Sequence, residues 1–511
     1  MMGNFMVVAS VVVGLYGDPG GSRALQFGPG KRRPLADVAF WGTLANKEET
    51  DGGSPEGNRW ATKRSHDQVG GEDPRDGTLS SLPRVGNTFL DRDRRGRAEL
   101  RRGIHRGDPG DPLRSLRQPK KVTRIAVLGA TGSIGTQALE VIRRLRRSGA
   151  ELEIVALAAG RRVEELCRAA SEFSVALVSL RGPEEAQKAR KLLPPYVEVF
   201  HGQEGLEAIA RHPQVDVVLN AVVGAAGLRA TLAALSAGKR VALANKESLV
   251  IGGHLVMELV RDPDQLIPVD SEHSALWQAM RGVRREEVRK LWITASGGAF
   301  RDLPPEDLAR VTPQEALSHP TWRMGPRITV DSATLVNKGF EVIEAHWLFG
   351  MSYERIGVLL HPQSLVHGLV ELVDGNVIAV ISEPDMRIPI QYALTYPRHR
   401  SPPACRLELA GKTLEFREIP WNKYPAFSVV VQAGKEGGTA PAAINAADEE
   451  LVAAFLAGRI PFTAIAEGLA YILERHHNVP CPTLEEIEAA DMWARTESRR
   501  WMRDRFGPTI V

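Results

Sequence analysis

Residues 129–135 have the sequence Gly129-Ala130-Thr131-Gly132-Ser133-Ile134-Gly135. They follow an apolar, β-branched run, Val122 to Leu128, and precede a helical pattern from Thr136 to Arg147. Glycines at a strand-to-helix turn let the backbone approach a pyrophosphate closely, and the helix N-terminus then faces the anion. The segment therefore predicts a dinucleotide-binding Rossmann domain that begins near Val122.

The residues after the second predicted strand, Leu152 to Leu157, indicate which dinucleotide is bound. An NAD site usually places Asp or Glu there to hold the ribose 2′-hydroxyl. This chain has Ala158-Ala159-Gly160-Arg161-Arg162 instead. Two guanidinium groups suit a 2′-phosphate, and no acid is present to repel it. The pattern favours NADPH over NAD, and the alternative is that both arginines are solvated residues at a helix start.

Further apolar segments alternate with helical patterns up to Val269, which is the signature of an α/β, doubly wound parallel sheet. A helix is expected at Val163 to Phe173. The other predicted strands are Val175 to Ser179, Val215 to Leu219, Arg240 to Ala244 and Leu266 to Val269.

Composition limits the classes of protein that the chain can belong to. Hydrophobic residues make up 43% of 511 residues, which is ordinary for a soluble protein of two or three domains. A net charge of +3 over this length argues against nucleic acid or a membrane surface as partners. The three cysteines, Cys167, Cys405 and Cys481, form neither a disulfide framework nor a zinc motif, so we expect a cytoplasmic location.

Residues 1–120 differ from the rest of the chain. They are rich in Gly, Asp, Arg and Pro, as in Gly70-Gly71-Glu72-Asp73-Pro74-Arg75, and show no sustained period of a strand or helix. We expect a disordered, dispensable extension. Residues 121–269 then form the dinucleotide-binding domain.

The pattern after Asp270 changes to α+β. We expect a catalytic domain at 270–396, a Pro-rich linker at 397–420 and a C-terminal helical domain at 421–511. Thr483 and Glu486 form a capping box before the last helix. The strands predicted in the catalytic domain are Leu291 to Ala295, Arg327 to Val330, Ile356 to Leu360, Leu365 to Leu372 and Val377 to Ser382.

Carboxylates follow the last strand of the predicted sheet directly, where such sheets bind ligands. Asp270 and Glu272 alternate along Val269-Asp270-Ser271-Glu272-His273, so in an extended chain both point to one side. Paired carboxylates repel unless a cation bridges them, and oxygen ligands favour Mg²⁺ or Mn²⁺. Glu341 is a candidate for the third ligand, and an exposed acidic turn is the alternative for Glu341 and Glu344.

Two polar segments are candidates for a site that binds a phosphate monoester and for the lid that covers this site. Ser332, Asn337 and Lys338 supply hydroxyl, amide and ammonium donors just ahead of a predicted helix. Residues 296–326, which begin at Ser296 and include His319-Pro320-Thr321-Trp322, are rich in charge and Pro. They indicate a mobile lid with Trp322 as the cover that excludes water, although a lone Trp is more often core.

Seven motifs, taken in order, resemble the 1-deoxy-D-xylulose 5-phosphate reductoisomerase family. The resemblance covers the chain from about Val122 onward. One departure is Arg162, which stands where the family usually has Asn. The motifs are Gly129–Gly135, Asn245-Lys246-Glu247-Ser248, Val269–His273, His319–Gly325, Val330–Glu344, His361-Pro362-Gln363-Ser364 and Glu383-Pro384-Asp385-Met386-Arg387.

The resemblance implies a three-part fold, a homodimer, and a reaction that needs NADPH and a divalent cation, with Co²⁺ as a further candidate beside Mn²⁺ and Mg²⁺. A small phosphorylated ketose, 1-deoxy-D-xylulose 5-phosphate, would be rearranged and reduced to 2-C-methyl-D-erythritol 4-phosphate in the non-mevalonate isoprenoid pathway. Two alternatives are an NADP-dependent semialdehyde or sugar dehydrogenase, and an NADP-sensing protein with a decayed catalytic site. The first lacks a suggestive Cys or Lys/Tyr centre, and the second would have lost carboxylates that are present.

The resemblance also implies roles for individual residues. It makes Asp270, Glu272 and Glu341 the metal ligands, and Lys246 and Ser271 the contacts to the reacting end of the substrate. It places Ser296, His319, Ser332, Asn337 and Lys338 in the phosphate pocket. The implied NADPH contacts are Thr131, Gly132, Ser133, Ile134, Gly160, Arg161, Arg162, Asn245, Glu247 and Gly325.

Overall fold

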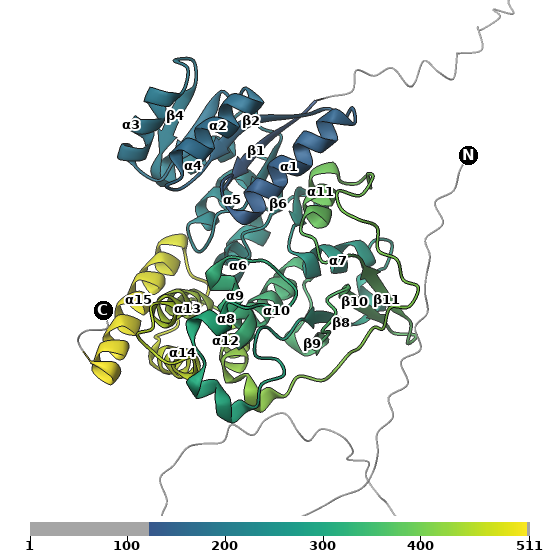
Figure 1. Ribbon diagram of the computed structural model, residues 1–511, viewed down its shortest axis with the longest axis vertical. Helices are drawn as coiled ribbons and strands as arrows, with labels where there is room; N and C mark the ends of the chain where they lie inside the picture. Colours follow the sequence, from purple (N-terminus) through teal and green to yellow (C-terminus); the bar gives the residue numbers. More distant parts are fainter. Residues whose placement is uncertain (1–121, 508–511) are drawn as a thin grey trace, which may run out of the picture. The chain divides into compact units, whose positions relative to one another are not determined.

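The structure is a computed structural model that describes residues 122–507. The expected N-terminal extension, residues 1–120, lies outside the described residues. Within this range, each helix is too short or too polar to span a lipid bilayer. The described residues contain two sheets and a group of C-terminal helices (Figure 1).

The first sheet has seven parallel strands in the order β4-β3-β2-β1-β5-β6-β7, which confirms the predicted doubly wound α/β class. Successive strands are added on one side of β1 up to β4 and on the other side from β5 onward. Loops at the carboxyl ends of the two strands at such a switch point bind ligands. Strand β4 has no counterpart among the predicted strands. The strands are β1 (Thr123–Leu128), β2 (Leu152–Ala158), β3 (Leu177–Leu180), β4 (Glu198–His201), β5 (Val217–Asn220), β6 (Arg240–Leu243) and β7 (Leu266–Pro268).

Helices cover both faces of this sheet. In α1, Ala138, Ile142 and Leu145 recur at helical spacing, are buried, and pack against one face together with α2. Helices α4, α5 and α6 cover the other face. The bounds are α1 (Ser133–Arg147), α2 (Val163–Phe173), α3 (Pro183–Leu192), α4 (Gly202–Arg211), α5 (Gly227–Ser236) and α6 (Glu247–Leu259).

The second sheet has four strands in the order β11-β10-β8-β9, and α7 packs on β10 and β11. Strands β8 and β9 are parallel and the other pairs are antiparallel, so β11 and β9 are the sheet edges. The bounds are α7 (Ser271–Ala279), β8 (Val288–Ala295), β9 (Ile356–Leu360), β10 (Val366–Leu372), β11 (Val377–Ile381) and α11 (Arg387–Thr395).

The predicted strand Arg327 to Val330 is wrong, because these residues belong to helix α9 (Pro326–Thr334). Pro326 occupies the first turn of α9, where its fixed φ suits a helix. Val330 is fully buried in the larger core, so burial outweighs the strand propensity of the β-branched residues. Helix α10 (Val336–Phe349) follows after Leu335, whose φ of 58° breaks the helix between the two.

The remaining helices form a group that packs against α6, α9 and α10 (Figure 1). In α13, Leu451, Val452 and Phe455 are buried, and in α15 the predicted capping box of Thr483 and Glu486 is present. The segment between 296 and 326 has only two short helical pieces, at Pro305–Arg310 and α8 (Pro313–Ala316). The C-terminal helices are α12 (Pro425–Glu436), α13 (Ala440–Leu456), α14 (Thr463–Arg475) and α15 (Leu484–Phe506).

Candidate active site

The glycine loop between β1 and α1 is shaped to hold a pyrophosphate. Gly129 has a φ of 83°, and a Cβ there would lie 2.3 Å from the carbonyl oxygen of Ala221. A Cβ on Gly135 would lie 2.1 Å from the Gly129 carbonyl oxygen. Both positions therefore require glycine, and the loop delivers the chain to the N-terminus of α1, which starts at Ser133. This cradle fits a dinucleotide phosphate.

The basic residues after β2 lie at the same edge of the sheet as the glycine loop. Gly160, Arg161 and Arg162 are exposed, and Arg162 directly precedes α2. The Arg162 Nη1 donates to the carbonyl oxygen of Thr131 at 2.6 Å. That bond ties the end of β2 to the glycine loop and leaves the charge at the surface, as a 2′-phosphate contact requires.

Asn245 and Glu247 lie at the end of β6 and the start of α6. The Asn245 side chain is buried, and its Nδ2 donates to the carbonyl oxygens of Val222 and Gly224 and to Glu247 Oε2. Glu247 Oε1 accepts the Gly224 N–H at 3.0 Å. These bonds hold the loop that follows β5, which packs on the glycine loop through Ala221.

The carboxylates come from two helices rather than from an extended segment. Asp270 is the N-cap of α7, with its Oδ1 accepting the Ser271 N–H at 3.0 Å, and Glu272 lies in the first turn. The expectation of an extended chain at 270–272 is wrong because Asp is a preferred N-cap and starts a helix here. Glu341 projects from α10, and one oxygen of each of the three carboxylates lies within 4.8 Å of the others.

Two lysine ammonium groups lie among these carboxylates. Lys246 Nζ is 2.7 Å from Asp270 Oδ2 and 3.2 Å from Glu341 Oε1. Lys338 Nζ is 2.5 Å from Glu272 Oε1 and 2.6 Å from Glu341 Oε2. Lys338, predicted as a phosphate donor, is thus placed between the carboxylates. The sites of both lysines are almost fully closed to solvent.

The charge balance of this cluster indicates a cation site. Burial opposes the charge on Lys246, but Asp270 and Glu341 outweigh it and raise its pKa well above the ordinary value. Burial together with Glu272 raises the pKa of Glu341 to about 7, despite Lys338 and Lys246. Three carboxylates face two ammonium groups, and an excess of buried negative charge is what a divalent cation would neutralise. The oxygen donors fit Mg²⁺ or Mn²⁺.

Ser271 and Asn337 hold the carboxylates in place. Ser271 Oγ donates to Glu272 Oε2 at 2.5 Å. Asn337 lies in the first turn of α10, and its Nδ2 donates to Glu341 Oε1 while its Oδ1 accepts from Lys246. Both side chains are therefore within reach of a ligand that contacts the cation. The donors of this motif lie within α9 and the first turn of α10, whereas the sequence placed them ahead of a helix.

Ser296 and His319 form a second polar group at the end of β8. His319 Nδ1 accepts the N–H groups of Thr321 and Trp322, so the proton is on Nε2, which lies 2.9 Å from Ser296 Oγ. Burial lowers the pKa of His319 to about 4, with Lys338 and Arg301 contributing. The imidazole is consequently neutral at pH 7 and presents one N–H donor.

One cavity joins the glycine loop, the carboxylates and the polar group. Trp322 lines it from the predicted lid segment and lies edge-on to His367, with ring centroids 6.2 Å apart. Thr131, Gly132, Gly160, Arg161, Arg162, Asn245, Glu247 and His319 lie outside its wall. The predicted residues that line it are Ser133, Ile134, Lys246, Asp270, Ser271, Glu272, Ser296, Trp322, Gly325, Ser332, Asn337, Lys338 and Glu341.

The structure adds residues that have no role in the sequence-based prediction. His273 Nε2 donates to the carbonyl oxygen of Glu341 at 2.9 Å, and its Nδ1 lies 3.4 Å from Glu344 Oε2. Glu344 is fully buried, so the alternative of an exposed acidic turn is wrong. Arg327 contacts Glu247 and three residues of α13. The sequence signal that could have pointed to Arg327 is Asp331 four residues later, because Arg and Asp at this spacing share one helix face.

Comparison with known families agrees with this geometry. Sequence models described as 1-deoxy-D-xylulose 5-phosphate reductoisomerase, its C-terminal domain, and DXP reductoisomerase C-terminal domain match residues 125–253, 266–349 and 381–497. The chain belongs to this family.

Individual members of the family are similar over most of their length. The reductoisomerase of Geobacillus kaustophilus is 49% identical over 366 residues, which are 71% of this chain and 95% of that protein. The one from Thermosynechococcus vestitus is 46% identical over 365 residues, 70% of this chain and 88% of that protein. The predicted resemblance is therefore confirmed.

Solved structures of the family share the fold. The Zymomonas mobilis reductoisomerase in complex with NADPH superposes with a TM-score of 0.70 at 38% identity, covering 75% of this chain and 99% of that one. A reductoisomerase bound to NADPH, fosmidomycin and magnesium superposes with a TM-score of 0.70 at 36% identity, covering 76% of this chain and 100% of that one. The first of these structures holds NADPH, and the second holds NADPH and magnesium.

Proposed function

We propose that this protein converts 1-deoxy-D-xylulose 5-phosphate to 2-C-methyl-D-erythritol 4-phosphate, with NADPH and Mg²⁺, Mn²⁺ or Co²⁺ as cofactors. The single cavity that joins the glycine loop to Asp270, Glu272 and Glu341 carries the proposal. A reaction that rearranges a sugar phosphate and then reduces it needs both cofactors beside one substrate. Family membership supports the same activity.

The carboxylates and lysines serve the reacting end of the substrate. When bound, NADPH supplies the hydride and the cation acts as a Lewis acid on the substrate's carbonyl and hydroxyl oxygens. Asp270, Glu272 and Glu341 hold the cation. Lys246 supplies an ammonium beside Asp270 and Glu341, where it can donate a hydrogen bond to a substrate oxygen. Ser271 Oγ donates to Glu272 Oε2 and can accept a hydrogen bond from a substrate hydroxyl.

The polar group around Ser296 holds the substrate phosphate. Because His319 is neutral with its proton on Nε2, it donates to Ser296 Oγ and leaves the Ser296 hydroxyl proton free to donate to an oxyanion, without adding charge. Ser332 and Asn337 line the same cavity and add a hydroxyl and an amide. Trp322 closes the cavity from the lid and excludes water from the reacting groups. Lys338 shares this wall, so it contributes positive charge to both ends of the substrate.

The NADPH contacts follow the carboxyl edge of the seven-stranded sheet. The backbone of the glycine loop receives the pyrophosphate, and Arg161 and Arg162 receive the 2′-phosphate. Asn245 and Glu247 fix the loop after β5, which packs on the glycine loop. The full proposed set is Thr131, Gly132, Ser133, Ile134, Gly160, Arg161, Arg162, Asn245, Glu247 and Gly325.

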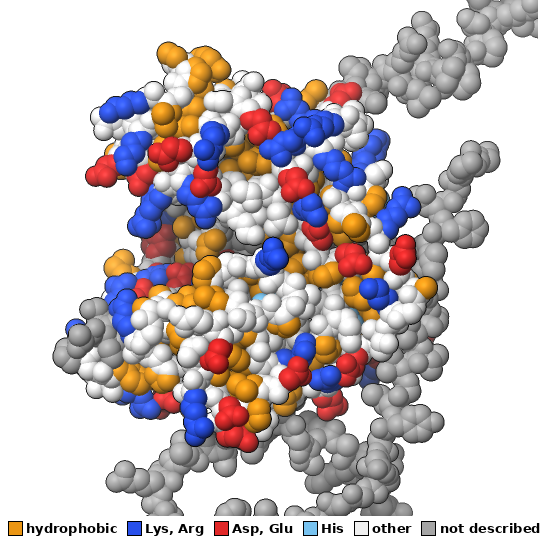
Figure 2. All heavy atoms as spheres, viewed as in Figure 1, with side chains coloured by type: hydrophobic (Ala, Val, Ile, Leu, Met, Phe, Trp, Pro, Cys, Tyr) orange, Lys and Arg blue, Asp and Glu red, His pale blue; other side chains and the backbone are white. Residues whose placement is uncertain are grey.

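The alternatives explain less of the site. A semialdehyde or sugar dehydrogenase does not need three buried carboxylates in one cation site. A sensor with a decayed site does not need Lys246 and Lys338 held between those carboxylates. Charges of both signs are interspersed on the face shown in Figure 2, which fits a small-molecule enzyme better than a nucleic-acid-binding protein.

The domain division, the dimer and the location also remain proposals. The division at 121–269, 270–396, 397–420 and 421–511 agrees with the two sheets and the helical group. A homodimer through β11 is supported by this edge strand, in which Ala379 is exposed and the flanking residues are half-buried. Cytoplasmic location is supported by three free cysteines.

The decisive experiment follows NADPH absorbance with 1-deoxy-D-xylulose 5-phosphate, with and without Mn²⁺. We expect turnover that requires the metal and that falls at least about 100-fold in Glu272→Gln, because a charged ligand and its hydrogen bonds are lost together. The matched control is Glu371→Gln, on β10 beside Arg289, which should keep its activity. Metal-independent turnover, or NADPH binding without turnover, would refute the proposal.

A further inference from the structure

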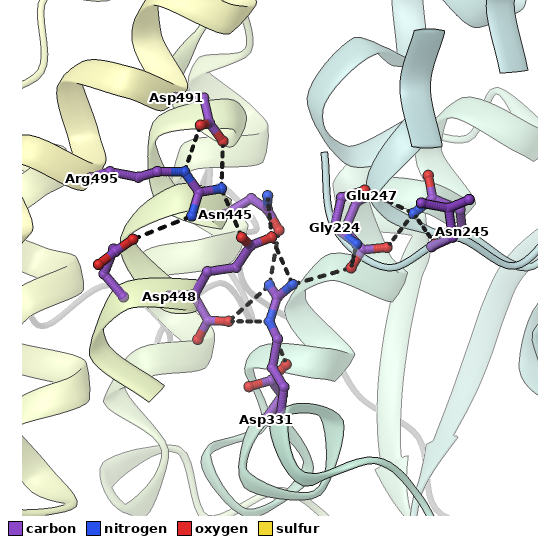
Figure 3. Close-up of polar contacts among 12 residues, drawn as sticks. Gly224, Asn245, Glu247, Asp331, Asn445, Asp448, Asp491 and Arg495 are labelled. Carbon is purple, nitrogen blue, oxygen red and sulfur yellow. Dashed lines mark hydrogen bonds and ion pairs between the residues drawn. The ribbon is translucent and has the colours of Figure 1, made fainter. Parts of the chain in front are cut away.

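Arg327, in the first turn of α9, joins the C-terminal helices to the dinucleotide domain. Its side chain is only 19% exposed. On one side its guanidinium donates to Asn445 Oδ1 at 2.9 Å, Asp448 Oδ2 at 3.0 Å and Glu449 Oε1 at 2.9 Å, all on α13. On the other side Nη1 donates to Glu247 Oε1 at 3.2 Å. Figure 3 shows Glu247 and Asn245 on one side of this cluster and the α13 residues on the other.

Glu247 connects Arg327 to the loop after β5. The same Oε1 that faces Arg327 also accepts the Gly224 N–H, and Oε2 accepts from Asn245. Asn245 in turn binds the carbonyl oxygens of Val222 and Gly224. The loop therefore depends on Glu247 at one point and on Asn245 at two.

This loop touches the predicted pyrophosphate cradle. Ala221, its first residue, lies so close to Gly129 that a Cβ on Gly129 would be 2.3 Å from the Ala221 carbonyl oxygen. A Cβ on Gly224 would be 2.6 Å from Glu449 Oε1, so the loop is also packed against α13. A displacement of the loop would consequently move the glycine loop.

Arginine suits this position because of its shape and its charge. Three nitrogens in a planar fork reach α6 and α13 at the same time, whereas the single ammonium of Lys would reach one side. Four carboxylates, on Glu247, Asp331, Asp448 and Glu449, lie within 3.5 Å of the guanidinium. Arg495 of α15 neutralises Glu449 from its far side, at 2.7 Å. Without Arg327, Glu247 would face the acids of α13 directly.

We propose that Arg327 is a positioning residue for the dinucleotide: it fixes Glu247, and through it the loop after β5, so that helix α13 becomes part of the NADPH site. The inference rests on the proposed function, because NADPH is the nucleotide that this function assigns to the site. Gly325 lies two residues before Arg327, so the same contact fixes the end of the lid nearest the cofactor.

The test is a double-mutant cycle of Arg327→Gln and Glu247→Gln, read as the Kd of NADPH by fluorescence titration of the full chain. We expect Arg327→Gln alone to weaken NADPH binding by about tenfold or more, the size of a lost charge-assisted hydrogen bond. In the Glu247→Gln background, Arg327→Gln should have little further effect on the Kd, because the contact between Arg327 and Glu247 that holds the loop is already lost. Mn²⁺ binding without nucleotide should stay within about twofold of wild type.

The controls separate positioning from a general loss of stability. Arg495→Gln removes a cation of the same cluster that does not contact Glu247, so it should lower Tm and leave the Kd unchanged. Arg327→Lys, which keeps the charge, serves if Arg327→Gln fails to fold, and should still weaken NADPH binding. Wild-type Kd in both Arg327 variants, or additive effects in the cycle, would overturn the inference. If wild type itself binds no NADPH, the proposed function fails; if it binds and turns over, only the inference is at stake.

Discussion

Gly135→Ala tests the glycine loop with a single methyl group. The added Cβ would lie 2.1 Å from the Gly129 carbonyl oxygen and 2.6 Å from Ala130 Cα, where ordinary contact begins at 3.4 Å. The loop would have to move by more than about 1 Å, since the neighbours are backbone atoms that cannot rotate away. The better helix propensity of Ala contributes only about 0.5–1 kcal/mol, less than the ~1–3 kcal/mol of overpacking. The variant should therefore be less stable.

The larger effect should fall on the cofactor. Moving the loop N–H groups away from the pyrophosphate would lose a charge-assisted hydrogen bond of about 1.5–3 kcal/mol, so we expect the Kd of NADPH to rise between about 10- and 100-fold. The assay is fluorescence titration, with Tm measured in parallel. Gly149→Ala, just past the other end of α1, is the control: its φ of 80° makes Ala strained, but nothing lies within 4 Å. It should lose about 1–2 kcal/mol of stability and bind NADPH normally. An unchanged Kd in Gly135→Ala would refute the proposal that the glycine loop binds the NADPH pyrophosphate.

Three other predictions concern titration and assembly. Burial lowers the pKa of His319 in the folded protein below its value in the unfolded chain. Wild type should therefore lose more stability than His319→Gln as pH falls from about 6.5 to about 4, measured by urea unfolding. Parallel stability-versus-pH curves for the two proteins would contradict this. Burial raises the pKa of Asp448 to about 6. The protonated Asp448 carboxyl therefore contributes stability at low pH, and this contribution is lost as pH rises from about 4 to about 6. Asp448→Asn should gain up to ~3 kcal/mol relative to wild type over that window, and no gain would refute the assignment. If the protein is the proposed homodimer through β11, Ala379→Glu should convert it to monomers in sedimentation velocity, because like charges would meet across the paired edge strands. A monomeric wild type would refute the proposed dimer.

The sequence predicted best where local pattern and tertiary structure agree. The apolar run up to Leu128 and the glycines after it leave the chain few options, and the structure has β1, the turn and α1 there. The alternation of strands and helices up to Pro268 likewise predicted the parallel sheet that the structure contains. Strand β4 was missed because Glu198 and His201 are exposed at the sheet edge, so it has no apolar pattern.

The errors arose where tertiary contacts override local preference. Arg327 to Val330 has the β-branched residues of a strand, yet Pro326 and burial of Val330 make it helical. Asp270 and Glu272 lie in one carboxylate cluster although helix α7 begins between them. Residue types were therefore enough to name the carboxylates, but not to give their geometry.

Contacts between distant residues could not be predicted from one sequence. Nothing local to Arg327 shows that Asp448, more than one hundred residues later, lies beside it. The same holds for the contact between Lys338 and Glu272, which are 66 residues apart in the sequence. Such pairs depend on how α9, α10 and α13 pack, which the pattern of each helix alone does not determine.

The two lysines between the carboxylates have a consequence for how the protein acquires its metal. Lys246 and Lys338 offset most of the negative charge of Asp270, Glu272 and Glu341. A divalent cation must therefore compete with two ammonium groups for the same carboxylate oxygens, and its net affinity is the difference between the two sets of interactions.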